Sequence, residues 1–211
     1  MANAMNINPT RMELLLLRKR LVLARRGHKL LKDKLDGLMR VFLEVQDDYR
    51  AHRREVDAEL PQVLKGFVLA EATAPASTTR EALDGLRRKL TVTPHTRRVM
   101  SVAAPRLEIA LDPMAGGYSR LHTSPDLDGA VQGLERVFPK LLKLAELEEM
   151  VRLLAAEIAR TRRRVNALEH TMIPRMTETA KYIASKLDEN ERSNTIRLLK
   201  IKEQRLIEAR S

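Results

Sequence analysis

Apolar residues recur three or four positions apart along two long segments, residues 9–72 and residues 125–210, and the stretch between them lacks this pattern. In the first segment the spacing holds from Leu14 to Val56 before it slips near Pro61. A 3-4 spacing kept over roughly six heptads is typical of a left-handed coiled coil. The predicted first seam is Leu14, Leu17, Leu21, Ala24, His28, Leu31, Leu35, Leu38, Phe42, Val45, Tyr49, His52 and Val56.

The second segment carries a similar seam that weakens toward its end. Its predicted positions are Leu127, Ala130, Leu134, Val137, Leu141, Leu144, Leu147, Val151, Leu154, Ile158, Thr161, Val165, Leu168 and Met172. Pro139 and Pro174 lie within this pattern, and each is expected to kink or interrupt the helix because proline removes a backbone donor. Beyond Pro174 only Met176, Ile183, Leu187, Leu198 and Ile201 continue the seam. We therefore expect the end of this helix to owe part of its order to a partner.

A helix of more than sixty residues would span about 95 Å, which is wider than a single domain made from 211 residues. The chain is therefore predicted to fold back on itself as an all-α, antiparallel two-helix coiled coil formed by its N- and C-terminal helices. Asn8 before Pro9 and Ser124 before Pro125 each match an N-cap followed by proline at the first helical position.

The middle segment, residues 73–124, is predicted to hold a short helix and a small β-hairpin. The short helix is expected over residues 79–90. Residues 97–102 and 106–111 resemble strands, and Gly116-Gly117 is a turn signal. This irregular region is expected to cap the far tip of the coiled coil.

The composition fits long helices better than a globular interior. Aromatic residues make up 3% of the chain, Trp and Cys are absent, and no apolar run approaches the length of a membrane span. The absence of Cys excludes disulfides and thiolate metal sites and is compatible with a reducing compartment. A soluble, cytoplasmic protein is expected.

The net charge of +11 is concentrated near the two ends of the chain. Residues 11–34 hold nine basic residues against Glu13 and Asp33, and residues 192–210 hold six against Glu203 and Glu208. In a simple hairpin these stretches would lie side by side and form one cationic end, attractive to an acidic partner or to nucleic acid. A second basic girdle is expected midway, where Arg160, Arg162, Arg163 and Arg164 would approach Arg50, Arg53 and Arg54.

The sequence contains no recognisable catalytic or cofactor motif. Its five histidines lack metal-ligand spacing, and no glycine-rich phosphate loop is present. Carboxylate pairs such as Asp47-Asp48 lie off the seam, whereas acid–base catalysis needs a sheltered pocket. We therefore expect no catalytic residue, metal or cofactor in this chain.

Several blocks resemble the D subunit of the V/A-type rotary ATPases. The first helix contributes residues 8–14, Asn-Pro-Thr-Arg-Met-Glu-Leu, and residues 26–34, Arg-Gly-His-Lys-Leu-Leu-Lys-Asp-Lys. The second contributes residues 139–146, residues 161–169 with Ile173-Pro174, and the tail blocks at residues 189–192 and 197–202. The blocks occur in the family's order along both helices, whereas the middle segment is less similar.

The resemblance implies a central rotor shaft without catalytic groups, peripheral to the membrane, which couples ATP hydrolysis or synthesis to proton or sodium transport. Its paired ends would enter a hexamer of A and B subunits, the small F subunit would bind midway, and a funnel-shaped adaptor on the membrane ring would hold the far tip. The bore contacts would be Arg11, Arg18, Lys19, Arg25, Arg26, Lys29, Arg192, Arg197, Lys200 and Lys202, and the mid-shaft contacts those of the second girdle. The alternatives are a basic coiled-coil protein that binds nucleic acid and a coiled-coil tether. Against nucleic-acid binding, the sequence offers no aromatic platform on which bases could stack.

Overall fold

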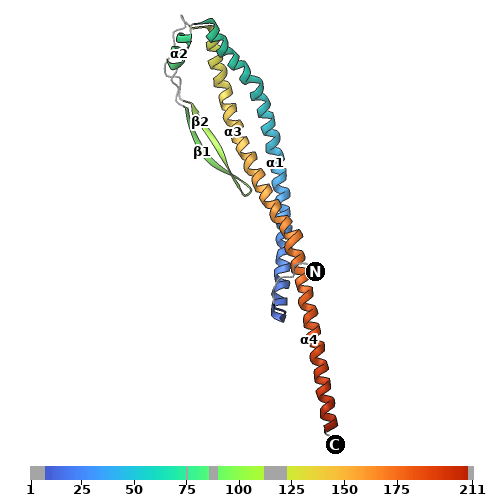
Figure 1. The fold of residues 1–211 in the computed structure, drawn as a ribbon. Coiled ribbons are helices and arrows are strands. Elements are labelled where there is room, and N and C mark those ends of the chain that lie inside the picture. Colours follow the sequence, from blue (N-terminus) through green and yellow to red (C-terminus); the bar gives the residue numbers. More distant parts are fainter. Residues whose placement is uncertain (1–7, 75, 86–89, 112–122, 209–211) are drawn as a thin grey trace. The chain divides into compact units, whose positions relative to one another are not determined.

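The computed structural model describes residues 8–74, 76–85, 90–111 and 123–208. Long helices dominate it, with one small helix and one β-hairpin between them (Figure 1). The prediction of a long-helix fold with a small hairpin is confirmed. In chain order the elements are α1 (Arg11–Thr73), α2 (Ala76–Gly85), β1 (Leu90–Val99), β2 (Val102–Leu111), α3 (Pro125–Asn166), the π-helix η1 (Ala167–Met172) and α4 (Ile173–Glu208).

The chain divides into two units. The terminal unit comprises Met1–Asp36 and Ala159–Ser211, and the hairpin unit comprises Gly37–Ile158. In the hairpin unit α1 and α3 run antiparallel: a side-chain carbon added at Gly66 would lie 3.1 Å from Cβ of Ala130, and one added at Gly133 would lie 2.8 Å from a methyl of Val63. In the terminal unit α1 pairs with α4 around a core of Leu17, Met176 and Ile183.

The predicted seams are largely the buried faces of the helices. Every position of the first seam is buried or half-buried. In the second seam up to Met172, only Leu134 and Met172 are exposed. At this point of α3 the buried residue that faces α1 is Gly133 and not Leu134, and its lack of a side chain lets Val63 approach closely. The periodicity therefore located the core of both units.

A single π-turn explains how the seam continues past Pro174. The N–H of Ile173 donates to the carbonyl of Leu168, five residues back, so η1 contains one residue more than an α-helical turn would. The buried seam accordingly moves from Leu168 to Met176, a step of eight positions where a heptad allows seven. The predicted interruption near Pro174 is confirmed, and it keeps the apolar face of α4 turned toward α1.

One of the two predicted helix starts is confirmed. Ser124 caps α3, since its hydroxyl accepts a hydrogen bond from the Asp126 N–H at 3.2 Å. Asn8 does not cap α1. The cap is Thr10, whose hydroxyl accepts from the Glu13 N–H at 3.2 Å, and the helix begins at Arg11. A Thr followed three residues later by Glu is a stronger N-cap pattern than Asn before Pro.

The middle segment contains the expected elements with different limits. The short helix covers Ala76–Gly85, not residues 79–90. The hairpin turns at Met100 and Ser101, inside the stretch predicted as its first strand. Pro94 and Pro105 both lie inside the paired strands, where proline is usually unfavourable. In a two-residue hairpin, however, Val99 and Val102 form a hydrogen-bonded pair, and hydrogen-bonded pairs alternate with non-hydrogen-bonded pairs along the ladder. Both prolines occupy non-hydrogen-bonded pairs, where a backbone N–H would point away from the partner strand, so the missing N–H breaks no bond of the ladder. The predicted turn at Gly116-Gly117 lies outside the described residues.

The hairpin lies along α3 and does not cap the far end of the helices. Val102 and Ala104 pack against Leu38, Met150 and Leu154, well inside the hairpin unit (Figure 1). At the end of α1 it is α2 that contributes to the core, through contact of Ala82 with Ala70 and Leu127. Strands of ten residues reach about 33 Å, long enough to extend back along α3 and cover part of the seam.

The predicted alignment of the two basic ends is wrong in register. Arg11, the first residue of α1, forms an ion pair with Glu191. Residues 192–208 of α4 therefore continue about 25 Å beyond the start of α1. The basic residues from Arg192 onward lie past the paired part of the terminal unit and not beside Arg18 to Lys34. The prediction assumed that the chain ends align, whereas α4 is longer than the stretch of α1 that faces it.

Among the described residues, no helix combines the length and the apolar character that crossing a membrane requires.

Candidate interaction surfaces

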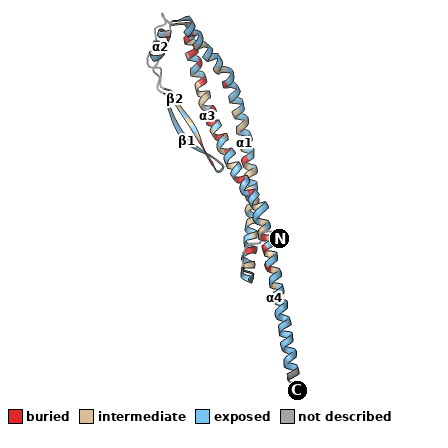
Figure 2. Cartoon of the chain, in the orientation of Figure 1, coloured by how far each residue is buried: buried red, intermediate tan, exposed pale blue. Residues whose placement is uncertain are grey.

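The last part of α4 exposes apolar and basic side chains together. Every residue from Arg192 to Leu206 is exposed, and Figure 2 shows α4 in the colour of exposed residues toward its end. Contiguous exposed apolar surface on a soluble chain commonly marks an interaction site. The exposed apolar residues are Ile196, Leu198, Leu199, Ile201 and Leu206.

The predicted bore contacts are all exposed, and the structure divides them into two groups. One group lies on α1 within the paired part of the terminal unit, and the other lies on the α4 extension. Arg11 pairs with Glu191, but within the described part of this unit no ion pair involves Arg18, Arg25 or Arg26. Their charge is therefore available to a partner. The exposed set is Arg11, Arg18, Lys19, Arg25, Arg26 and Lys29 on α1, with Arg192, Arg197, Lys200 and Lys202 on α4.

A shallow groove of about 420 Å³ runs between α1 and α4 in the terminal unit. Leu21, Val22, Ala180 and Ala184 provide an apolar lining, and Arg18 and Lys181 stand beside it. An apolar side chain next to a carboxylate would suit this groove, since its lining is apolar and its two charges are positive.

The second basic girdle would join residues of two different units. Arg50, Arg53 and Arg54 belong to the hairpin unit, whereas residues 160–164 belong to the terminal unit, so the meeting of the two arginine clusters stays a prediction. Within the hairpin unit, the Nζ of Lys140 on α3 lies 2.5 Å from a carboxylate oxygen of Glu59 on α1.

Both arginine clusters remain exposed, and two members of the first have local partners. The guanidinium of Arg53 donates to Asp57 at 3.0 Å, and this hydrogen bond, with the charge of Asp57, raises the pKa of Arg53 above its usual value. Arg50 lies 3.9 Å from Asp47. Such exposed pairs contribute little to stability and leave the cations accessible. The exposed members of the second cluster are Arg160, Arg162, Arg163 and Arg164.

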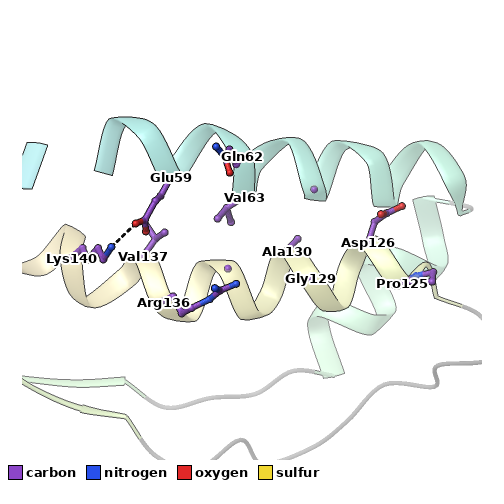
Figure 3. A pocket seen from close by; sticks show the side chains of 12 residues that line it. Glu59, Gln62, Val63, Pro125, Asp126, Gly129, Ala130, Arg136, Val137 and Lys140 are labelled. Carbon is purple, nitrogen blue, oxygen red and sulfur yellow. Dashed lines mark hydrogen bonds and ion pairs between the residues drawn. The ribbon is translucent and has the colours of Figure 1, made fainter. Parts of the chain in front are cut away.

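In the hairpin unit a groove lies between α1 and α3 (Figure 3). It has a volume of about 810 Å³, and Gly129 leaves open space along α3. The ion pair between Glu59 and Lys140 lies toward one end of it, while Asp126 lies toward the other (Figure 3). Mixed charges and an open form are more typical of a protein contact than of a small-molecule pocket, which is usually concave and mostly apolar.

Within the described residues, no group of three or more His, Asp or Glu side chains is arranged to hold a metal ion. His28, a seam position, lies 3.2 Å from Glu169 on η1, which joins α1 to the π-turn by one polar contact. This contact has a structural role within the terminal unit.

Comparison with known proteins identifies the family. The sequence profile described as the D subunit of ATP synthase matches residues 13–203. The chain belongs to this family. A V-type ATP synthase D subunit of Thermoanaerobacter sp. (strain X514) is 48% identical over 200 residues, covering 94% of this chain and 96% of the relative. The protein of the same description in Acetivibrio thermocellus is 45% identical, covering 97% and 94%, and the one in Fusobacterium nucleatum is 45% identical, covering 94% and 96%.

Membership of this family of D subunits confirms the resemblance found in the sequence. The chain is accordingly a central stalk component of a V/A-type ATPase, and this interpretation is favoured over a nucleic-acid-binding or tethering coiled coil.

The exposed apolar residues of α4 form a surface that the sequence predicted only in part. The weakening seam beyond Pro174, with the polar stretch Glu189-Asn190-Glu191, led us to expect a partner at this end of the helix. Leu198 and Ile201 were assigned to the seam, and Ile196, Leu199 and Leu206 were not singled out.

Proposed function

We propose that this chain is the central shaft of a V/A-type ATPase and transmits torque between the catalytic subunits and an ion-translocating membrane ring. In this proposal the terminal unit enters the bore of the hexamer of A and B subunits. The α4 extension, from Arg192 onward, reaches deepest into the bore. The chain contributes no catalytic group and stays at the cytoplasmic side of the membrane, as a peripheral part of the complex.

The observation that carries this proposal is the bare extension of α4. Its exposed leucines and isoleucines would be costly in water if nothing covered them, and its basic residues would attract an acidic lining. A surrounding ring of subunits would cover an isolated helix on all sides, whereas a partner bound on one side would leave half of it bare. Exposure of every residue from Arg192 to Leu206 fits the ring.

The other partners would bind the hairpin unit and the end of α3. The exposed arginines 50, 53 and 54, and separately those at 160–164, are candidate contacts for the small F subunit of the stalk. The end of α1 with α2 is the candidate contact for the funnel-shaped adaptor. It exposes Leu64, Val68 and Leu69 close to the core formed by Ala70, Ala82 and Leu127.

The mechanism that this assigns to the chain is conformational. The terminal unit presents different side chains around its circumference, with the α1–α4 groove beside Arg18 on one side. Three catalytic sites around the shaft would then contact different surfaces at any moment. A shaft of this kind biases which site is closed through differences in contact free energy, and rotation passes that bias from site to site.

The test is reconstitution of the full chain with separately purified A and B subunits. Arg18→Glu, Arg25→Glu and Arg26→Glu combined should weaken binding to the hexamer at least tenfold at low salt, with a smaller difference at high salt because ions screen the charges. The matched control combines Lys65→Glu, Arg80→Glu and Arg98→Glu, three exposed cations of the hairpin unit, and should leave hexamer binding unchanged.

Equal affinity of the terminal-unit variant and the wild type at every salt concentration would contradict an electrostatic contact there. Failure of the wild type to bind A and B subunits, together with retention of nucleic acid on the purified chain, would overturn the shaft proposal itself.

A further inference from the structure

The turn of the β-hairpin contains a residue that its backbone conformation disfavours. Met100 has a φ of 54°, and it is the one non-glycine residue with positive φ in the described part of the chain. Two-residue hairpin turns usually place Gly, Asn or Asp at such positions, because a larger side chain is crowded there. A methionine at this position therefore suggests that its side chain makes a contact that offsets the unfavourable backbone conformation.

The side chain of Met100 reaches Gly37 on α1. A carbon added at Gly37 would lie 2.9 Å from the terminal methyl of Met100 and 3.7 Å from its sulfur. Glycine at residue 37 thus leaves the space that Met100 fills. Gly27, in the same helix, has no atom within 4 Å of an added carbon, so its lack of a side chain serves no such contact.

Few further contacts hold the hairpin on the helices. Val102 and Ala104 are buried in the cluster that contains Leu38. On the outer side of β2 the Leu107 N–H donates to a carboxylate oxygen of Glu146 at 3.4 Å. Glu146 is itself buried, and the ammonium of Lys143 holds its other oxygen at 2.9 Å.

The first strand contributes to this attachment only next to the turn, where Val99 packs against the same cluster. From Thr91 to Arg98 every residue of β1 is exposed, and Val99 is half-buried. The hairpin is therefore attached through its turn and one strand, and the turn carries backbone strain that docking must outweigh. A segment with few buried contacts and an exposed ladder opens more readily than the helices beneath it.

We propose that the β-hairpin is a releasable arm that docks on α1 and α3, with Met100 seated on Gly37 as its lock and Glu146 as a second anchor. In the docked state the arm covers Leu38, Met150 and Leu154 of the seam. In the released state the two helices stay paired and this apolar stretch becomes accessible. The inference concerns the chain itself and does not depend on the rotary role.

Native-state hydrogen exchange on the isolated full chain tests the release. The hairpin amides, such as that of Ala104, should exchange through an opening with a weaker denaturant dependence than global unfolding, because less surface is exposed, and at least tenfold faster than the helical amides of Leu38 and Leu154. Exchange of hairpin and helix amides at one common rate, with one common denaturant dependence, would show that the hairpin opens only on global unfolding and would overturn the proposal.

Three substitutions test the lock. Met100→Ala removes the seated side chain while keeping the strained φ, and it should accelerate hairpin exchange about tenfold. Gly37→Ala pushes against the flexible end of Met100, so a smaller acceleration of about threefold is expected. Gly27→Ala is the matched control in the same helix and should leave hairpin exchange unchanged.

The helical amides of Leu38 and Leu154 should exchange at the wild-type rate in Met100→Ala and no faster than that in the two glycine variants, because Ala favours the helix more than Gly does. Unchanged hairpin exchange in both Met100→Ala and Gly37→Ala would overturn the lock. Equal acceleration of hairpin and helix amides in Met100→Ala would overturn it too, because the methionine would then be supporting the whole core.

Discussion

Leu154 and Leu198 both occupy seam positions of a long helical segment, yet Leu154 is 0% exposed and Leu198 is 67% exposed. Leu154 lies in the hairpin unit, where α1 and the hairpin cover α3. Leu198 lies on the α4 extension, beyond the pairing of Arg11 with Glu191. An apolar heptad position thus becomes core where a neighbouring helix covers it and interaction surface where the neighbour has ended.

Exchanging each leucine for alanine should separate these two roles most clearly. Leu154→Ala leaves a cavity in a closed core and should lower the free energy of unfolding of the isolated chain by about 2–5 kcal/mol. Leu198→Ala removes a side chain that already faces water and should change it by less than about 0.5 kcal/mol. Urea titration followed by circular dichroism measures both. The reverse ranking would show that the extension is packed in solution and the hairpin unit is loose.

Removal of the extension should affect binding and spare stability. Truncation after Glu191 deletes a stretch whose described residues, Arg192 to Leu206, are all exposed, so thermal unfolding of the isolated chain should stay near that of the wild type. Binding to the A and B subunits should weaken about a hundredfold, because buried apolar area and several charge contacts are lost together. Calorimetric unfolding and an affinity titration with the reconstituted hexamer provide the two readouts.

A truncated chain that binds the hexamer as tightly as the full chain would place the contact on α1 instead. The combined Arg18, Arg25 and Arg26 variant would then become the decisive comparison.

The sequence predicted which face of each helix is buried, because burial follows a spacing that residues such as Leu17, Leu38 and Leu154 carry themselves. It did not predict register, since the pairing of Arg11 with Glu191 depends on how two helical segments of unequal length meet, which the spacing within either segment does not contain. The predicted single cationic end divides into two groups for the same reason. Their residues are exposed as expected, but which of them are neighbours depends on the pairing of helices far apart in sequence.

The π-turn offers a way to shift register inside the terminal unit by one residue. Deletion of Thr171 together with Pro174→Ala should convert η1 into an α-helical turn and leave Met176 and Ile183 facing α1. Deletion of Glu178 together with Pro174→Ala instead rotates Ile183 by about 100° away from the seam. The second variant should be less stable than the first by about 2 kcal/mol, because Ile183 loses its burial.

Thermal unfolding of the two variants side by side is the measurement. Because both lack one residue and carry the same Pro174→Ala change, equal melting temperatures would mean that the π-turn does not maintain the seam.

The smallest expected effect comes from two ion pairs, one in each unit. On α3 the guanidinium of Arg152 donates to both oxygens of Glu149, and on α4 the ammonium of Lys186 donates to Glu189. These hydrogen bonds hold the pKa of each carboxyl below its ordinary value of 4.5. A lowered carboxyl pKa adds stability that is complete above the ordinary value and is lost as the pH falls through the lowered one.

Glu149→Gln and Glu189→Gln should therefore each lower the melting temperature slightly at pH 7, and the difference from the wild type should vanish in acid, once the wild-type carboxyl is protonated. Thermal unfolding at pH 7 and pH 3, with salt added to screen the pairs, measures this. Each pair joins residues three apart on one helix and is solvent-exposed, so the loss should be similar in the two units despite their different cores. A much larger drop in melting temperature for one variant would mean that its carboxylate makes a stabilising contact beyond the neighbouring Arg152 or Lys186. Burial alone would then not account for the different stability of the two units.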